Sequence, residues 1–95
     1  MKTAISCSSI HGQIFICDTC QMIHLEFGHF SIDFNEEKLK RFLNHLENID
    51  GRFIEVENRL NRYRRKILVA MPHFHLKLMF TNDELREIRS LTVIF

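Results

Sequence analysis

Two stretches of the chain, 46 residues apart, carry the same pattern, and this repeat is the strongest constraint on the fold. Residues 30–35 and 76–81 each alternate apolar residues with others and end in a good helix-capping residue, Asn35 or Thr81. Another apolar run and a short turn precede each stretch. Each half of the chain therefore predicts a strand, a tight turn, a second strand and a helix.

The residues after the two caps predict the two helices. Apolar residues recur at three- and four-residue steps after the first cap, which predicts a helix over 36–48. Gly51 follows closely enough to end this helix. Thr81 and Glu84 have the spacing of a capping box, so a second helix is expected over 82–91.

Short connections between the apolar runs predict antiparallel strands. The fold class is therefore α+β, with an antiparallel sheet of about five strands and two helices on one face, in the order βββα-ββα. Strands are expected at residues 13–17, 21–27, 30–34, 65–71 and 74–80. Residues 51–63 fit either a short helix or an extended segment. The chain is interpreted as one α+β domain, 1–95, made of an N-terminal Cys-containing hairpin (1–27), a first strand-helix unit (28–50) and a second hairpin-helix unit (65–95).

One face of the sheet is expected to lie under both helices. It would hold Ile23, Leu25, Phe27, Phe30, Ile32, Phe34, Leu76, Leu78 and Phe80. The opposite face is polar, except that residues 66–71 are apolar on both sides through Leu68 and Ala70. This pattern indicates either a central strand or a face covered by another subunit, so a homodimer and an unidentified protein partner both remain open.

The composition excludes several classes of protein. The 95 residues include 13 Lys and Arg and 12 Asp and Glu, so the net charge of +1 disfavours a dedicated nucleic-acid binder. No window approaches the roughly 20 apolar residues of a membrane span. The N-terminus lacks the apolar segment of a secretory signal, so a cytoplasmic protein without membrane association is expected. A core this small gains stability from a cross-link such as a bound metal ion.

The three cysteines suggest such a cross-link. An odd number does not suit a closed disulfide framework. Cys17 and Cys20 have the spacing of a zinc knuckle, in which a tight turn directs two thiolates at one ion. We expect Cys7 to fold back over this turn as a third zinc ligand, with His24 as the fourth and His11 as the alternative fourth ligand.

Two other interpretations of the cysteines stay open. In the first, the three cysteines are free thiols. In the second, Cys17 and Cys20 cycle between dithiol and disulfide. In thioredoxin-like proteins, however, the Cys-x-x-Cys precedes a helix, whereas a strand is expected here. His29, His73 and His75 form a second candidate metal group, although such residues are more often simple surface histidines.

The remaining motifs point to no reaction. One basic segment, 59–66, contains four arginines, a lysine and Tyr63, and its chemistry suits a weak RNA or DNA contact or a solvated loop. The sequence holds no phosphate-binding Gly-rich loop and no Ser, His and Asp at a meaningful spacing. We therefore do not expect an enzyme.

Several short motifs together suggest a family. They are the Cys-x-x-Cys at 17–20, Ile-His-Leu-Glu-Phe-Gly at 23–28, Arg-Arg-Lys-Ile at 64–67 and Phe-Thr-Asn-Asp-Glu-Leu at 80–85. From Cys7 to Leu91 the layout resembles a family of small uncharacterised proteins, a domain of unknown function, from Bacteroidota-type bacteria. The resemblance implies a bacterial cytosolic setting and lends no catalytic or binding residues. The knuckle also looks like half of a zinc ribbon, without the second half.

The sequence thus predicts a non-enzymatic interaction or regulatory module with a structural zinc site. The alternatives are a thiol-redox protein that uses Cys17 and Cys20, or a weak nucleic-acid binder through residues 59–66.

Overall fold

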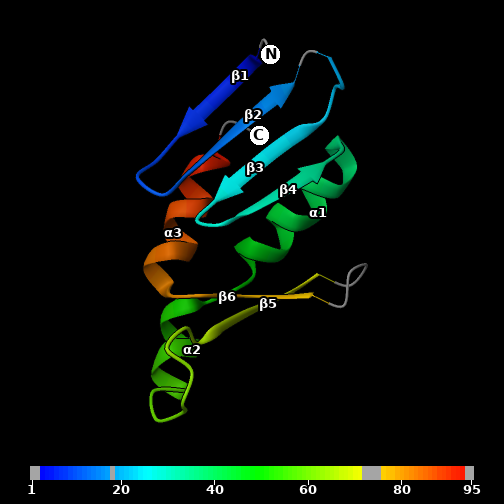
Figure 1. The fold of residues 1–95 in the computed structure, drawn as a ribbon. Helices are drawn as coiled ribbons and strands as arrows, with labels where there is room; N and C mark the ends of the chain where they lie inside the picture. Colours follow the sequence, from blue (N-terminus) through cyan, green and yellow to red (C-terminus); the bar gives the residue numbers. More distant parts are fainter. Residues whose placement is uncertain (1–2, 18, 72–75, 94–95) are drawn as a thin grey trace.

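The computed structural model describes residues 3–17, 19–71 and 76–93, which form two antiparallel sheets and three helices (Figure 1). The first sheet has the order β1-β2-β3-β4, and the second is the ribbon β5-β6. In chain order the elements are β1 (Thr3–Ser8), β2 (Gly12–Cys17), β3 (Ile23–Phe27), β4 (Phe30–Phe34), α1 (Glu36–Glu47), α2 (Gly51–Glu57), β5 (Ile67–Met71), β6 (Leu76–Phe80) and α3 (Asn82–Leu91).

Helices α1 and α3 lie on one face of the four-stranded sheet, as the sequence predicts (Figure 1). They contact each other, and α1 also packs on β4 while α3 packs on β2. One apolar cluster joins both sheets to these helices. Its buried members are Ile14, Ile23, Leu25, Phe27, Phe34, Leu39, Phe42, Leu46, Ile67, Val69, Leu78, Phe80, Leu85, Ile88 and Leu91.

The predicted helix starts are confirmed, together with their caps. The Asn35 side chain accepts a hydrogen bond from the Lys38 N–H at 2.7 Å. Thr81 and Glu84 form a reciprocal capping box, in which each side chain accepts the backbone N–H of the other residue. Because both caps follow the second strand of a hairpin directly, the chain turns into each helix within one residue.

The prediction of a single five-stranded sheet is wrong, because β1 is an additional strand and β5-β6 is a separate ribbon. The sequence of β1, Thr-Ala-Ile-Ser-Cys-Ser, contains mostly small and polar residues, so its hydrophobic alternation is weak. Its pairing with β2 comes from backbone hydrogen bonds at the sheet edge. Such an edge strand needs little apolar surface and leaves a faint sequence pattern.

Strand β5 is not the central strand that its apolar sequence suggests. Among the described residues it pairs with β6 alone. Leu68 is 45% exposed, and Ala70 is exposed beside it. Leu76, expected in the core, is 47% exposed because it lies at the end of the ribbon, after the segment 72–75 that the structure does not describe.

The ambiguous segment after α1 begins with a helix, and Gly51 starts this helix instead of ending α1. Helix α1 ends at Asn48, and Asp50 caps α2 by accepting the Phe53 N–H at 3.1 Å. A Cβ atom on Gly51 would lie 2.4 Å from Oδ1 of Asn82. Glycine therefore allows α2 to approach the start of α3 closely.

No helix in the described part of the chain is long and apolar enough to span a membrane.

Candidate metal centre

The turn between β2 and β3 brings Cys17 and Cys20 together. The Cys17 N–H donates to the Met22 carbonyl, and the Gln21 N–H donates to the Cys17 carbonyl, both at 3.0 Å. Gln21 has φ of 59°, the left-handed conformation that reverses the chain directly after Cys20. This turn leads back into β3, where His24 lies opposite Phe15 of β2.

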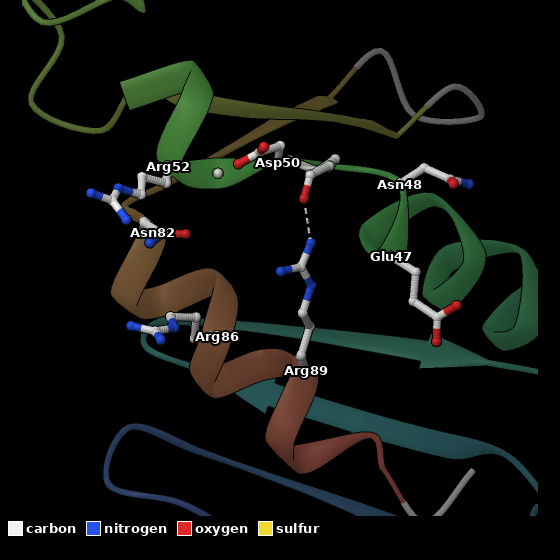
Figure 2. A pocket seen from close by; sticks show the side chains of 9 residues that line it. Glu47, Asn48, Asp50, Arg52, Asn82, Arg86 and Arg89 are labelled. Atoms are coloured by element: carbon white, nitrogen blue, oxygen red, sulfur yellow. Dashed lines mark hydrogen bonds between the residues drawn. The ribbon is translucent and has the colours of Figure 1, made fainter. Parts of the chain in front are cut away.

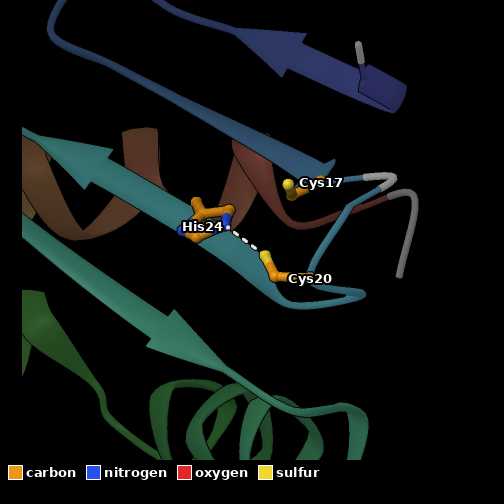
Figure 3. A group of neighbouring side chains, drawn as sticks. All are labelled: Cys17, Cys20 and His24. Atoms are coloured by element: carbon orange, nitrogen blue, oxygen red, sulfur yellow. Dashed lines mark hydrogen bonds between the residues drawn. The ribbon is translucent and has the colours of Figure 1, made fainter. Parts of the chain in front are cut away.

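The two thiols and the imidazole of His24 form a compact cluster (Figure 3). One ligand atom from each of the three residues lies within 4.8 Å of the others. The Cys20 sulfur is 3.5 Å from Nε2 of His24. Two thiolates bound to one tetrahedral zinc ion at about 2.3 Å lie about 3.8 Å apart. The three groups therefore need only small side-chain movements to bind one ion.

His24 is held in the orientation that a metal ligand needs. Its Nδ1 lies 2.6 Å from Oδ1 of Asp33, its cross-strand partner on β4. The Phe15 ring stacks on the imidazole, with 5.1 Å between ring centroids. Because Asp33 takes Nδ1, Nε2 is the nitrogen that faces the sulfurs, as in carboxylate–histidine–zinc arrangements. The hydrogen bond to Asp33 raises the pKa of His24 above 6.5, although burial opposes this shift.

The turn also stabilises the Cys17 thiolate. Hydrogen bonds around the turn, the largest from the Cys20 backbone N–H, lower the pKa of Cys17 from 9.0 to about 7. The Cys20 thiol, the Thr19 N–H and His24 act in the same direction, and burial acts against them. Because thiolates and not thiols bind metal ions, this turn supplies an anionic donor near neutral pH. Cys17 is buried at 1% exposure, whereas Cys20 is exposed.

The structure does not bring Cys7 to this cluster. Cys7 lies opposite Ile14 in the β1-β2 register. Ile14 precedes Cys17 by three residues on β2. At about 3.3 Å per residue, this offset is roughly 10 Å along the strand. Cys7 also packs against the apolar core, on the face of the sheet opposite to that of Cys17. The expectation that Cys7 folds back over the turn fails because β1 is extended.

His11, the alternative fourth ligand, also lies elsewhere. Its Nδ1 is 2.7 Å from Oε1 of Glu87 on α3, and its backbone N–H donates to Oε2 of the same carboxylate. Ser9 donates to this oxygen as well. Partial burial opposes the lowering of the pKa of Glu87, but these hydrogen bonds outweigh it. His11 therefore ties the β1-β2 turn to α3.

Asp33 and Phe15 are not among the residues predicted from the sequence, although the sequence contains a pattern that identifies Asp33. A two-residue turn at Gly28 and His29 places Phe27 opposite Phe30. Counting back along both strands then pairs His24 with Asp33. The hairpin register alone therefore identifies the carboxylate beside the histidine.

The other candidate groups gain less from the structure. His73 and His75 lie outside the described residues, and His29 is exposed in its turn. In the basic segment, Arg65 pairs with Glu84 at 2.8 Å. Lys66 donates to Asn61 at 2.7 Å. Much of this positive charge is thus engaged within the chain.

A known protein family matches nearly the whole chain. A family of unknown function, DUF6686, matches residues 1–94, which include the Cys-x-x-Cys. The chain belongs to this family. The expected membership of an uncharacterised family is thereby confirmed, while the Bacteroidota origin stays a prediction. No curated protein and no solved structure matched the chain.

Proposed function

We propose that the chain binds one zinc ion through Cys17, Cys20 and His24, and that this ion fixes the β2-β3 turn of a non-enzymatic interaction or regulatory module in a reducing cytoplasm. The observation that carries the proposal is the approach of the three ligand atoms to within 4.8 Å of one another. Asp33 supports it by orienting the imidazole.

The donor set favours zinc among the common ions. Two thiolates and an imidazole suit zinc, whereas magnesium and calcium prefer oxygen ligands. Three protein ligands leave a fourth position for water or for a side chain of another molecule. Asp33 is engaged by His24, and Glu26 on the same strand accepts a hydrogen bond from Gln13 at 2.7 Å. The carboxylates beside the cluster are thus engaged, which favours a structural role.

The interaction role rests on apolar side chains that the single chain leaves in water. They lie on α2, in the segment after it and on the β5-β6 ribbon, and are Phe53, Val56, Leu60, Leu68 and Leu76. Exposed apolar groups gathered on neighbouring elements favour a protein partner or a second copy of the chain. The native mass of the purified protein would show directly whether two copies of the chain associate.

Elemental analysis tests the zinc proposal. The untagged protein is expected to contain one zinc per chain, and Cys20→Ser is expected to lose it. Cys7→Ser is the matched control and should retain the metal, because Cys7 lies away from the cluster. A metal-free wild-type protein, or loss of zinc from the Cys7 variant alone, would contradict the proposal.

A thiol-redox function is the second candidate, and the lowered pKa of Cys17 favours it. In this function the two thiols would give up two electrons and two protons to an external oxidant and form a Cys17–Cys20 disulfide. The burial of Cys17 and the strand after Cys20 count against a thioredoxin-like mechanism. Metal-free protein with a readily reducible 17–20 bridge would favour this function over zinc binding.

A further inference from the structure

A second polar site lies away from the thiol cluster, where α2 begins beside the start of α3. A cavity of about 860 Å³ opens between the end of α1, the start of α2 and one face of α3. Figure 1 shows this region near the β5-β6 ribbon, away from the β2-β3 turn. Its volume lies within the 300–1,000 Å³ that is typical of small-molecule sites.

Three arginines from two helices line this cavity. Arg86 and Arg89 lie on one face of α3, and Asn82 lies one helical turn before Arg86 on the same face. Arg52 comes from α2. Figure 2 shows Arg52, Asn82 and Arg86 along one side of the cavity, with Arg89 near its centre. The close approach that Gly51 allows between α2 and α3 creates this arrangement.

The guanidinium groups of Arg52 and Arg86 have no partner within the described chain. Both side chains are exposed, and neither makes a hydrogen bond or an ion pair with another described residue. Arg41 and Arg65, in contrast, pair with Glu37 and Glu84. Two unpaired cations on one side of a cavity make that side positive, so it can attract an anion.

Arg89 has a structural task and one unused donor. Its guanidinium donates to the carbonyls of Leu46 and Ile49 and so ties α3 to the end of α1. Its Nε–H is buried and has no acceptor among the described residues. Because this nitrogen has almost no accessible surface, Arg89 contributes positive charge to the cavity and not a hydrogen bond to its contents.

The acidic residues of the cavity offset this charge only in part, because Glu47 and Asp50 stand against three arginines. Asp50 uses its carboxylate to cap α2 through the Phe53 N–H. Glu47 lies on the far side of Arg89 from Arg52 and Arg86 (Figure 2). The side of the cavity with Asn82 therefore presents two free cations.

We propose that this cavity binds the phosphoryl group of a small phosphorylated molecule. A phosphoryl group accepts hydrogen bonds from several directions, which suits guanidinium groups that approach from two helices, and it can accept from arginine in a bidentate manner. The cavity is larger than a phosphate ion, so it leaves room for the remainder of the molecule. This site is independent of the proposed zinc site.

Amide chemical shifts measured during titration test the proposal. Inorganic phosphate and glycerol 3-phosphate are each added to the protein as purified, and saturable shifts are expected at residues 48–52 and 82–89. The double variant Arg52→Gln and Arg86→Gln should weaken binding by about tenfold or more, because two charge-assisted contacts are lost. Arg89 is left intact because it supports the fold.

A matched control removes the same charge elsewhere. Arg62→Gln with Arg64→Gln also removes two positive charges, from an exposed segment, and should change the affinity by less than about twofold. Tighter binding of glycerol 3-phosphate than of inorganic phosphate would indicate a phosphate ester, and equal binding would indicate free phosphate. Absence of saturable shifts, shifts confined to other residues, or an equal loss in the control would overturn the proposal.

Discussion

The two strand-strand-helix units, β3-β4-α1 and β5-β6-α3, have equivalent buried faces and different outer faces. Phe34 and Leu39 in the first unit correspond to Phe80 and Leu85 in the second, and all four are buried. On the outer face, His24 and Asp33 form a polar pair in the first unit. The second unit has exposed Leu68 at the corresponding face.

This difference shows which part of the repeat the fold requires. Both units must bury an apolar face against a helix, so that face and the helix caps repeat. The outer face carries no such requirement, and its chemistry differs between the units. Among the described residues, the first unit has a neighbouring strand, β2, that continues into the Cys-x-x-Cys turn, and the second unit has none. The candidate metal centre therefore belongs to one unit alone.

The largest expected effect tests the equivalence of the buried faces. Leu39→Ala and Leu85→Ala should each lower the free energy of unfolding by about 2–5 kcal/mol, since each leaves a cavity in the shared core. Urea denaturation measures both. Leu60→Ala, at a side chain that is 90% exposed, is the control and should change stability by less than about 0.5 kcal/mol. A large cost in one unit and almost none in the other would break the comparison.

The next effect tests the difference between the outer faces. Asp33→Asn should weaken zinc binding by about 10–100-fold, because the carboxylate orients His24. Competition with a chromophoric chelator measures this affinity, and Glu26→Gln on the same face should leave it unchanged. An unaltered affinity in the Asp33 variant would show that the carboxylate has no role at the cluster.

The same variant predicts a change in pH dependence of the metal-free protein. Asp33 raises the pKa of His24, so this pair stabilises the fold below pH 6.5, and the stabilisation is lost as pH rises through the raised value. In Asp33→Asn the pKa of His24 should fall toward 6.5, which an NMR titration of the imidazole reports. A pKa that stays raised would assign the shift to another group.

The helix caps give a smaller effect. Asn35→Ala and Thr81→Ala should each destabilise the protein by about 0.5–2 kcal/mol, because each leaves helix N–H groups without an acceptor. Thr81→Ala should cost more, since it also disrupts the reciprocal capping box. Thermal unfolding of both variants measures the difference, and a larger cost at Asn35 would contradict this ranking.

The smallest effect is confined to the second unit. Partial burial opposes the shift, but hydrogen bonds from Arg65 and Thr81 lower the pKa of Glu84 below 4.5. These hydrogen bonds therefore stabilise the folded protein above pH 4.5, and this contribution is lost as the pH falls through the lowered pKa of Glu84. The stability difference between wild type and Glu84→Gln should shrink below about pH 4. A difference that stays constant down to pH 2 would remove this role of Glu84.

The sequence could predict those features that depend on residues close together in the chain. Caps such as Asn35 and Thr81, the hairpins and the inward-facing residues all follow from local spacing. The meeting of Cys17, Cys20 and His24 is local too, since one turn and the start of one strand contain all three. Asp33 was within reach through the register of a two-residue hairpin.

The features that the sequence could not predict depend on which segments become neighbours. Alternation shows which side of β5 is buried but not whether a second strand lies beside it. Cys7 was placed at the metal site because β1 carries few apolar residues and no strand was expected there. The cavity between α2 and α3 joins Arg52 with Arg86, and no spacing in the sequence connects them.

X-ray absorption at the zinc edge of the zinc-loaded protein tests the central claim most directly. The proposed site predicts two sulfur neighbours at about 2.3 Å and nitrogen at about 2.0–2.1 Å, with the remaining position taken by a light atom. The spectrum should be unchanged in Cys7→Ser. Three sulfur neighbours in the wild type that become two in this variant would contradict the account, because Cys7 would then be a ligand.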